Sequence, residues 1–317
     1  MVRRKVIDVS LNLGYEKNAI GKCIGYQEYM ASDVEEATFM LDGVRKKYNT
    51  PWPQPVPMTI DTLIEAMDEA NVVGGVITGM DYTSKAPYYT KNPYTPLRLL
   101  CPPEYVKEVL DLDRKRFKAL AGIDPLNNPT DKIMDNIKKY ILDWGFSGIK
   151  LMPLAGYYPS DPELMYPIYK LCVDLDAIVC INSSHSCWHK ARLLKETPLQ
   201  IDEIAQDFPD LKIHILCGGE RRWRHLDAIG VCLNSRNVCL DTSPALPELW
   251  TSYINVPDEF RLAATMIPDN MMYASEYPYC FPITRGVDGI DSIEGVSEEF
   301  KNKLFYENAK RFYGFEV

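Results

Sequence analysis

The sequence predicts one domain over residues 1–317, of the α/β class, folded as a (β/α)8 TIM barrel. Short runs rich in β-branched residues alternate with longer amphipathic runs along the whole chain. This alternation occurs about eight times, as a closed parallel sheet requires. An open doubly wound sheet would give a similar rhythm, but no glycine-rich phosphate loop follows the first strand. The pattern therefore favours the barrel.

Each predicted strand is a short apolar run. The runs cover residues 5–9, 72–78, 117–123, 147–152, 177–182, 212–217, 237–241 and 271–275. The clearest helical patterns between them, with apolar residues three and four positions apart, cover residues 59–71, 131–145, 163–176 and 199–210. Residues 15–58 form the main insertion. Their stretch KKYNTPWPQPVPM favours an extended loop because proline disrupts helices. A loop of this size after the first strand could act as a lid or substrate wall.

Composition and charge exclude several classes of function. Lys and Arg number 35 and Asp and Glu number 44, and the resulting net charge of −9 argues against a general nucleic-acid-binding protein. No apolar run reaches the roughly 18 residues of a membrane-spanning helix, and the N-terminus lacks the apolar core of a secretory signal. We therefore expect a cytoplasmic protein without a membrane partner. The nine cysteines form no CxxC pair and are expected as buried free thiols.

Polar residues end almost every predicted strand, which is where TIM barrels place catalytic groups. The first strand, VIDVSLNLG, has Asp8, Ser10 and Asn12 at alternate positions, so their side chains are expected to converge on one space. The other strand ends or the loops after them supply Asp81, Asp124, Lys150, Asn182, His185, Cys217, Glu220, Asp241, Ser243, Ser275 and Glu276. This polar rim predicts a small-molecule site at the mouth of the barrel.

Five stretches resemble one known family in their order and spacing. They are GFSGIKLMP (145–153), FPDLKIHILCGGE (208–220), NVCLDTS (237–243), MMYASEYPY (271–279) and ENAKRFYGF (307–315). They are similar to the amidohydrolase-related family that includes aminocarboxymuconate-semialdehyde decarboxylase and the resorcylate decarboxylases. The resemblance covers nearly the whole chain. It implies a barrel with a divalent metal at the strand ends, a homo-oligomer such as a homodimer, and hydrolysis, decarboxylation or hydration of small molecules.

The residues that the resemblance implies as metal ligands are replaced in this sequence. The corresponding positions hold Ser10, Asn12, Asn182, Cys217 and Glu276. Serine hydroxyls and asparagine amides are poor ligands for zinc and related metals. We therefore expect a metal-independent site without a cofactor. The alternative is one zinc or manganese ion held by Cys217, Glu276 and His185.

Four residues are candidates for the chemistry. Glu276 stands where the family keeps an acidic residue, and it is our first choice for proton transfer. Cys217 precedes two glycines whose N–H groups could bind an oxyanion, so it is either a nucleophile or a buried inert thiol. His185 could act as a general base. Lys150 could bind a substrate carboxylate or phosphate, act as an acid or base, or simply pair with a nearby acid.

Polar and aromatic residues near the same strand ends are candidates for substrate binding. They are Ser10, Asn12, Asn182, Glu220, Arg221, Tyr158, Tyr277 and Tyr279. The tyrosines would form an apolar wall with hydroxyl donors, and Arg221 beside Glu220 would bind an anion. Two functions remain: an enzyme that hydrolyses or decarboxylates a small aromatic or carboxylated substrate, and a pseudoenzyme that binds a ligand or a protein. The polar strand ends favour the enzyme.

Overall fold

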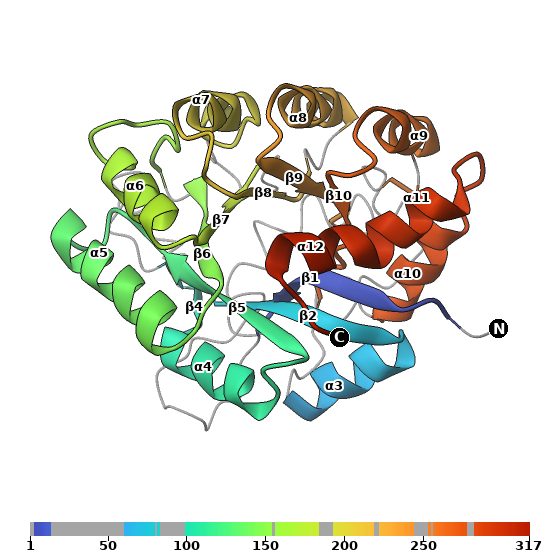
Figure 1. Ribbon diagram of the computed structural model, residues 1–317, viewed down its shortest axis with the longest axis horizontal. Helices are drawn as coiled ribbons and strands as arrows, with labels where there is room; N and C mark the ends of the chain where they lie inside the picture. Colours follow the sequence, from blue (N-terminus) through green and yellow to red (C-terminus); the bar gives the residue numbers. More distant parts are fainter. Residues whose placement is uncertain are drawn as a thin grey trace, which may run out of the picture.

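The chain folds as the predicted TIM barrel. The computed structural model describes residues 3–13, 60–79, 81–82, 99–153, 156–183, 193–218, 222–243, 253–254, 256–277 and 282–317. Eight parallel strands form one sheet whose neighbours follow chain order from β1 to β10 (Figure 1). The ends of the sheet meet through backbone bonds from Val9 N–H to the Tyr273 carbonyl at 3.0 Å and from Asn12 N–H to the Tyr277 carbonyl at 2.9 Å. The predicted insertion at 15–58 lies outside the described residues.

All eight predicted barrel strands are present. They are β1 (Val6–Asn12), β2 (Val72–Thr78), β5 (Phe117–Ile123), β6 (Gly148–Leu151), β7 (Ile178–Asn182), β8 (Ile213–Leu216), β9 (Val238–Asp241) and β10 (Met271–Met272). β10 is shorter than predicted, and the N–H of Tyr273 just after it bonds to the Leu304 carbonyl outside the sheet. A separate antiparallel pair consists of β3 (Asp81–Tyr82) and β4 (Leu99–Leu100).

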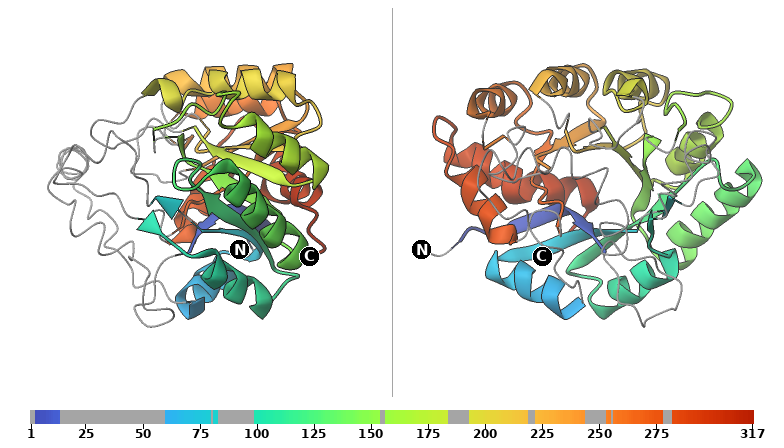
Figure 2. Two further views of the ribbon diagram at one scale, coloured as in Figure 1. Left: turned by 90° about the vertical axis from the view of Figure 1, so that its left-hand side faces the viewer. Right: turned by 180° about the vertical axis from the view of Figure 1, so that it is seen from behind.

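Helices surround the sheet in both views of Figure 2. They are α3 (Ile60–Glu69), α4 (Pro103–Leu112), α5 (Thr130–Lys138), α6 (Tyr166–Asp174), α7 (Leu199–Asp207), α8 (Arg222–Asn234), α9 (Pro257–Met266), α10 (Ile283–Asp291), α11 (Glu298–Asn302) and α12 (Asn308–Tyr313). The described residues also include short turns of other helix types, η1 (Lys139–Asp143), η3 (Leu193–Lys195) and η4 (Lys303–Glu307). The four helices predicted by sequence pattern correspond to α3, α5 with η1, α6 and α7.

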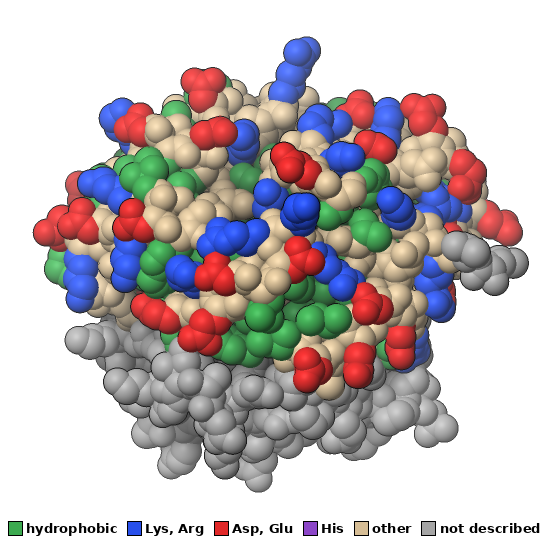
Figure 3. All heavy atoms as spheres, turned by 60° about the horizontal axis from the view of Figure 1, so that its bottom comes forward, with side chains coloured by type: hydrophobic (Ala, Val, Ile, Leu, Met, Phe, Trp, Pro, Cys, Tyr) green, Lys and Arg blue, Asp and Glu red, His purple; other side chains and the backbone are tan. Residues whose placement is uncertain are grey.

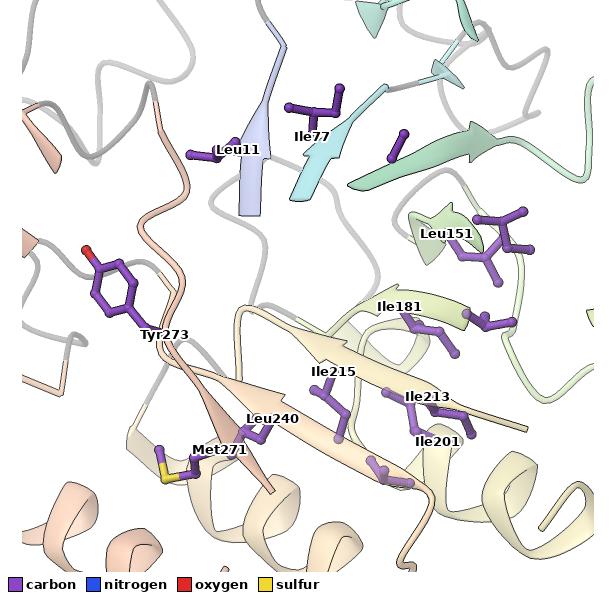
Figure 4. Packing of buried hydrophobic residues seen from close by; sticks show 14 of the residues in the cluster. Leu11, Ile77, Leu151, Ile181, Ile201, Ile213, Ile215, Leu240, Met271 and Tyr273 are labelled. Atoms are coloured by element: carbon purple, nitrogen blue, oxygen red, sulfur yellow. The ribbon is translucent and has the colours of Figure 1, made fainter. Parts of the chain in front are cut away.

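The apolar core has two parts. The larger part fills the space between sheet and helices, where residues such as Leu11, Ile77 and Leu151 point outward from their strands (Figure 4). The smaller part lies inside the barrel and includes Tyr313 and Phe315 from the C-terminal segment. The ammonium of Lys118, near the start of β5, lies 5.8 Å from the Phe315 ring. The C-terminal segment therefore closes the N-terminal end of the barrel, which leaves the opposite end for a site.

Partway along β1, the odd-numbered side chains change from pointing into the barrel to pointing outward. Ile7 and Val9 belong to the inner core, whereas Leu11 and Leu13 belong to the outer core. Strict alternation would place all four side chains on one face. The pairing of β1 with β2 is irregular between Asp8 and Leu11, as at a β-bulge, and this irregularity reverses the alternation. The three polar residues of β1 therefore do not share one orientation, contrary to the sequence prediction.

The exterior carries both signs of charge. Acidic and basic side chains are interspersed on the face shown in Figure 3, with apolar side chains between them. Among the helices of the described ranges, none has the length and apolar character needed to traverse a bilayer.

Candidate functional site

A lysine occupies the interior of the barrel near the C-terminal strand ends. Lys150 lies on β6 and is 1% exposed. Its Nζ donates hydrogen bonds to Asn12 Oδ1 at 2.8 Å and to Thr78 Oγ1 at 3.2 Å. Thr78 Oγ1 in turn donates to Asn12 Oδ1 at 3.1 Å. Residues from β1, β2 and β6 thus hold a buried positive charge in place, and we call these three residues the lysine cluster.

Two hydrogen-bonding atoms of β1 remain unused, and one of them belongs to Asn12 of this cluster. Within the part of the chain that the structure describes, Asn12 Nδ2 and Ser10 Oγ are buried without a hydrogen-bond partner. Buried polar atoms in folded proteins are nearly always hydrogen-bonded to protein or water. Their presence here indicates a place for a polar ligand or for water.

Asp8 holds two segments of the barrel together. Its Oδ1 accepts the backbone N–H groups of Ser10 at 3.1 Å and of Ser275 at 3.0 Å. Burial raises the pKa of Asp8 to about 7, although the bonds from Ser275 and Ser10 oppose this shift. Asp8 therefore connects β1 to the segment after β10, and its carboxyl takes up a proton near neutral pH.

Cys217 and Glu276 face each other from different strand ends. Cys217 Sγ donates to Glu276 Oε2 at 3.2 Å. Both residues have a left-handed backbone, with φ of 61° at Cys217 and 62° at Glu276. Residues other than glycine seldom adopt this conformation, and it concentrates at functional sites. We call these two residues the thiol–carboxyl pair.

The pKa of the Glu276 carboxyl is shifted to a value close to neutral pH. Burial raises its pKa to about 7, and the charge of Asp241 acts in the same direction. The positive charge of Lys150 and the thiol of Cys217 oppose the shift. A carboxyl with this pKa can both accept and release a proton near pH 7, as a general acid or base must.

A third group of polar residues hydrogen-bonds to the backbone of Cys217. Asp241 Oδ1 accepts the N–H of Cys217 at 3.1 Å and the hydroxyl of Ser243 at 2.7 Å. Asp241 Oδ2 lies 2.9 Å from His214 Nε2, and His214 Nδ1 lies 2.7 Å from the Tyr313 hydroxyl. We call His214, Asp241 and Ser243 the aspartate cluster. Its bond to the Cys217 N–H means that this N–H is already engaged and is a poor candidate for oxyanion binding.

His214 and Asp241 form a buried ion pair. Burial by itself lowers the pKa of His214, but interactions with Cys180 and Asp241 raise it to about 10. The imidazole is therefore protonated at neutral pH and donates from both ring nitrogens. The contacts of His214 to Asp241 and Tyr313 make it part of a polar network inside the barrel.

Position 218 requires glycine because its backbone passes too close to β9 to leave room for a Cβ. Its φ is 23°, and a Cβ at this position would lie 2.6 Å from the Asp241 carbonyl oxygen. A larger residue would push the chain away from Asp241 and displace Cys217. The glycine after Cys217 therefore serves the position of the backbone.

The structure brings some of the predicted site residues together and separates others. Asn182 is buried at the end of β7. Tyr158 is 41% exposed, and its ring lies 4.6 Å from the Lys195 ammonium. Tyr277 is buried in the outer core. Neither tyrosine faces the lysine cluster, so we omit both from the candidate site. The remaining predicted residues, His185, Glu220, Arg221 and Tyr279, lie outside the described residues.

Two participants were missed or undervalued at the sequence level. Thr78 is the last residue of β2, yet we selected Asp81, which follows the strand. Applying the strand-end rule to the last residue of the strand itself would have found Thr78. Asp241 was recognised as a strand end, but nothing in the sequence pairs it with His214, 27 positions away.

The described residues do not fit a divalent metal. No group of three or more His, Cys, Asp or Glu side chains within them could hold an ion. The cation Lys150 instead bonds to Asn12, at a position where the resemblance implies a metal ligand. An ammonium cannot coordinate a metal ion and repels one nearby. His185, the third ligand of the alternative zinc or manganese site, lies outside the described ranges.

Comparison with known proteins identifies the family. Residues 103–315, well over half of the chain, match a family described as amidohydrolase. The chain belongs to this amidohydrolase family. No curated protein sequence compared with the chain matches it.

Solved structures share the fold of this amidohydrolase. An uncharacterised TIM-barrel protein from Bordetella bronchiseptica is 20% identical, with a TM-score of 0.73 and coverage of 98% of this chain and 99% of that one. A 4-oxalomesaconate hydratase from Rhodopseudomonas palustris is 18% identical, with a TM-score of 0.59 and coverage of 98% and 95%. A 5-carboxyvanillate decarboxylase from Novosphingobium aromaticivorans, complexed with manganese and a nitrobenzoic acid, is 16% identical, with a TM-score of 0.62 and coverage of 98% and 96%.

Proposed function

We propose that this protein is an enzyme that decarboxylates or hydrolyses a small carboxylated, aromatic substrate by proton transfer through Glu276, without a divalent metal. The observation that carries the proposal is the thiol–carboxyl pair. It holds a carboxyl with a pKa of about 7 at 3.2 Å from a thiol, on strained backbone at the strand ends. Such a group suits acid–base catalysis at neutral pH.

The charge of the site supports an anionic substrate. Lys150 places a buried positive charge inside the barrel, and this charge acts on Glu276. Two solved structures of the same fold are a 5-carboxyvanillate decarboxylase and a 4-oxalomesaconate hydratase, and both of these named compounds are carboxylated small molecules. These names support the same class of substrate for this chain.

In a decarboxylation, Glu276 would supply the proton that replaces the lost group. The bond between the ring carbon and the carboxylate breaks, carbon dioxide leaves, and the bonding electrons remain on the carbon. The protonated carboxyl of Glu276 then transfers its proton to that carbon and becomes a carboxylate. In a hydrolysis, the ionised carboxyl would instead take a proton from water as the water oxygen bonds to the substrate carbon, and would return that proton to the leaving group as the scissile bond breaks.

Cys217 has two possible parts in this chemistry. As a hydrogen-bond donor, its thiol orients the Glu276 carboxyl. As a nucleophile, it would transfer its proton to Glu276 and attack as a thiolate. We favour the first role because Cys217 is buried and belongs to the inner apolar core.

The test is turnover by Glu276→Gln and Cys217→Ser variants, assayed with 5-carboxyvanillate and 4-oxalomesaconate. Glutamine preserves size and hydrogen bonding but cannot exchange a proton, so turnover should fall by a factor on the order of 10²–10⁴. Serine preserves a hydrogen-bond donor, so Cys217→Ser should retain most activity. Circular dichroism would confirm that both variants fold.

Near-normal turnover by folded Glu276→Gln would contradict the role of Glu276. Loss of activity in Cys217→Ser, on the scale of the Glu276 variant, would indicate a nucleophilic thiol. A wild-type protein that binds carboxylated compounds but turns none of them over would favour the pseudoenzyme.

A further inference from the structure

We infer that Lys150 and Asn12 form a carboxylate-binding site in which the Lys150 ammonium is the resident cation, in place of a divalent metal. The inference rests on the proposed function in that the bound carboxylate belongs to the substrate. It adds the position at which the substrate is held. It also accounts for the poor fit of the described residues to a metal.

The surroundings of Lys150 leave its charge without a partner. Its hydrogen-bond acceptors, Asn12 Oδ1 and Thr78 Oγ1, are both neutral oxygens. Among the described residues, no carboxylate forms an ion pair with it, and Glu276 interacts only through longer-range charge. Burying a charge without a counter-ion is costly, so such a charge indicates a missing anion.

Another buried lysine of the same chain has carboxylate neighbours. Lys301 is 9% exposed, and its Nζ lies 3.7 Å from carboxylate oxygens of both Asp291 and Glu298. Lys150 is more deeply buried and has no equivalent neighbour in the described ranges. The difference is expected if the partner of Lys150 arrives with a ligand.

The unused amide donor of Asn12 matches the acceptors of a carboxylate. Asn12 Oδ1 receives hydrogen bonds from both Lys150 and Thr78, which fixes the orientation of the amide and leaves Nδ2 as a free donor among the described residues. A carboxylate accepts several hydrogen bonds through two oxygens, and its bonds to a cation are among the strongest in proteins. A cation beside a neutral amide donor therefore suits an anion and would repel a metal ion.

Binding at this site would also affect the proton of Glu276. The charge of Lys150 is one of two influences that favour the ionised form of Glu276. A carboxylate bound to Lys150 would offset that charge, and Glu276 would take up a proton. The substrate would thus bring the proton donor into its active form on arrival.

The experiment is calorimetric titration of the full-length protein with 5-carboxyvanillate, 4-oxalomesaconate and benzoate as probes. Lys150→Met should weaken binding of the carboxylate by about 10- to 100-fold, the scale of a hydrogen bond to a charged group. Glu276→Gln should bind within a few-fold of wild type while losing turnover. Lys170→Met, at a site on α6 with a 74% exposed side chain, is the matched control and should bind like wild type.

The same titration separates this inference from the proposed function. Retained binding with lost turnover in Glu276→Gln supports both the carboxylate site and the proton-transfer role of Glu276. Normal turnover in that variant would contradict the role of Glu276 and leave the carboxylate site standing. Unchanged affinity in Lys150→Met, or no binding of any probe by wild type, would overturn the carboxylate site. Elemental analysis should find well below one equivalent of transition metal. Stoichiometric metal whose chelation abolishes binding would also overturn it.

Thermal unfolding of the free protein provides a second readout. Replacing an unpaired buried charge with an apolar side chain of similar length should leave the melting temperature of Lys150→Met equal to or above that of wild type. A lysine that merely supports the fold would give the opposite result. A marked fall in melting temperature would therefore count against a ligand-binding role.

Discussion

The aspartate cluster and the lysine cluster are both buried polar groups inside one barrel, but they are completed differently. In the aspartate cluster, both oxygens of Asp241 receive hydrogen bonds, and the charge of Asp241 is matched by His214. In the lysine cluster, the described residues that meet the charge of Lys150 offer it only neutral oxygens, and Asn12 retains a donor unused by them. A completed network fixes a conformation, whereas an incomplete one has room for a ligand.

The difference assigns separate tasks to the two sides of the barrel. The aspartate cluster binds the N–H of Cys217 and so fixes the strained backbone beside Glu276. The lysine cluster supplies the cation to which we assign a bound carboxylate. Both clusters act on Glu276, because Lys150 lowers its pKa and Asp241 raises it. The comparison predicts that changes in the aspartate cluster cost stability, and changes in the lysine cluster cost binding.

The largest loss of stability is expected for His214→Leu. This change leaves Asp241 buried with an uncompensated charge, which should lower the free energy of unfolding by about 3–5 kcal/mol. Urea denaturation measures the effect. Adding Asp241→Asn, which keeps an acceptor for Cys217 N–H, should recover part of the loss. A single-variant loss below about 1 kcal/mol would show that the ion pair is unimportant.

The pH dependence of the same experiment carries a definite sign. The folded pKa of His214, about 10, lies above the unfolded value of 6.5. The stabilisation that protonated His214 contributes is therefore fully present below about pH 6.5 and is lost as the pH rises through 10. Wild type should lose stability across this alkaline range, and His214→Leu should lack that component.

A smaller effect of opposite sign is expected for Asp8→Asn. Burial raises the folded pKa of Asp8 from 3.8 to about 7, so its neutral form is favoured and wild-type stability falls as the pH rises between these values. Asparagine keeps the Oδ1 acceptor for Ser10 and Ser275 and carries no charge. The variant should gain at most about 4 kcal/mol at pH 8 relative to wild type.

Denaturation at pH 4 is the control for this variant. There Asp8 is largely protonated in the folded protein, so the two proteins should be nearly equally stable. An Asp8→Asn protein that is less stable than wild type at pH 8 would show that Asp8 is needed in its ionised form.

The strands and the fold could be predicted because β-branched runs and their spacing are local signals. The face that each residue of β1 presents could not, because the irregular pairing between Asp8 and Leu11 depends on β2. Residue-by-residue alternation placed Asp8 with Asn12 in one space. The structure uses Asp8 to connect β1 with Ser275 instead.

The candidate site was predictable in position but not in its partnerships. The strand-end rule selected Lys150, Asn12, Cys217 and Glu276, and the structure places them in the two groups described above. The ion pair of His214 with Asp241 joins neighbouring strands, and its contacts arise only when the sheet forms. Nothing in the sequence signals the left-handed backbone of Glu276.

Direct titration of the Glu276 carboxyl is the most informative single measurement. Difference infrared spectroscopy of wild type against Glu276→Gln, followed over pH, isolates this one carboxyl without knowledge of the substrate. We expect a carboxyl that titrates with a pKa of about 7 in wild type and is absent from the variant. A Glu276 carboxyl that titrates near its ordinary value of 4.5 would contradict its role as the proton-transfer group at neutral pH.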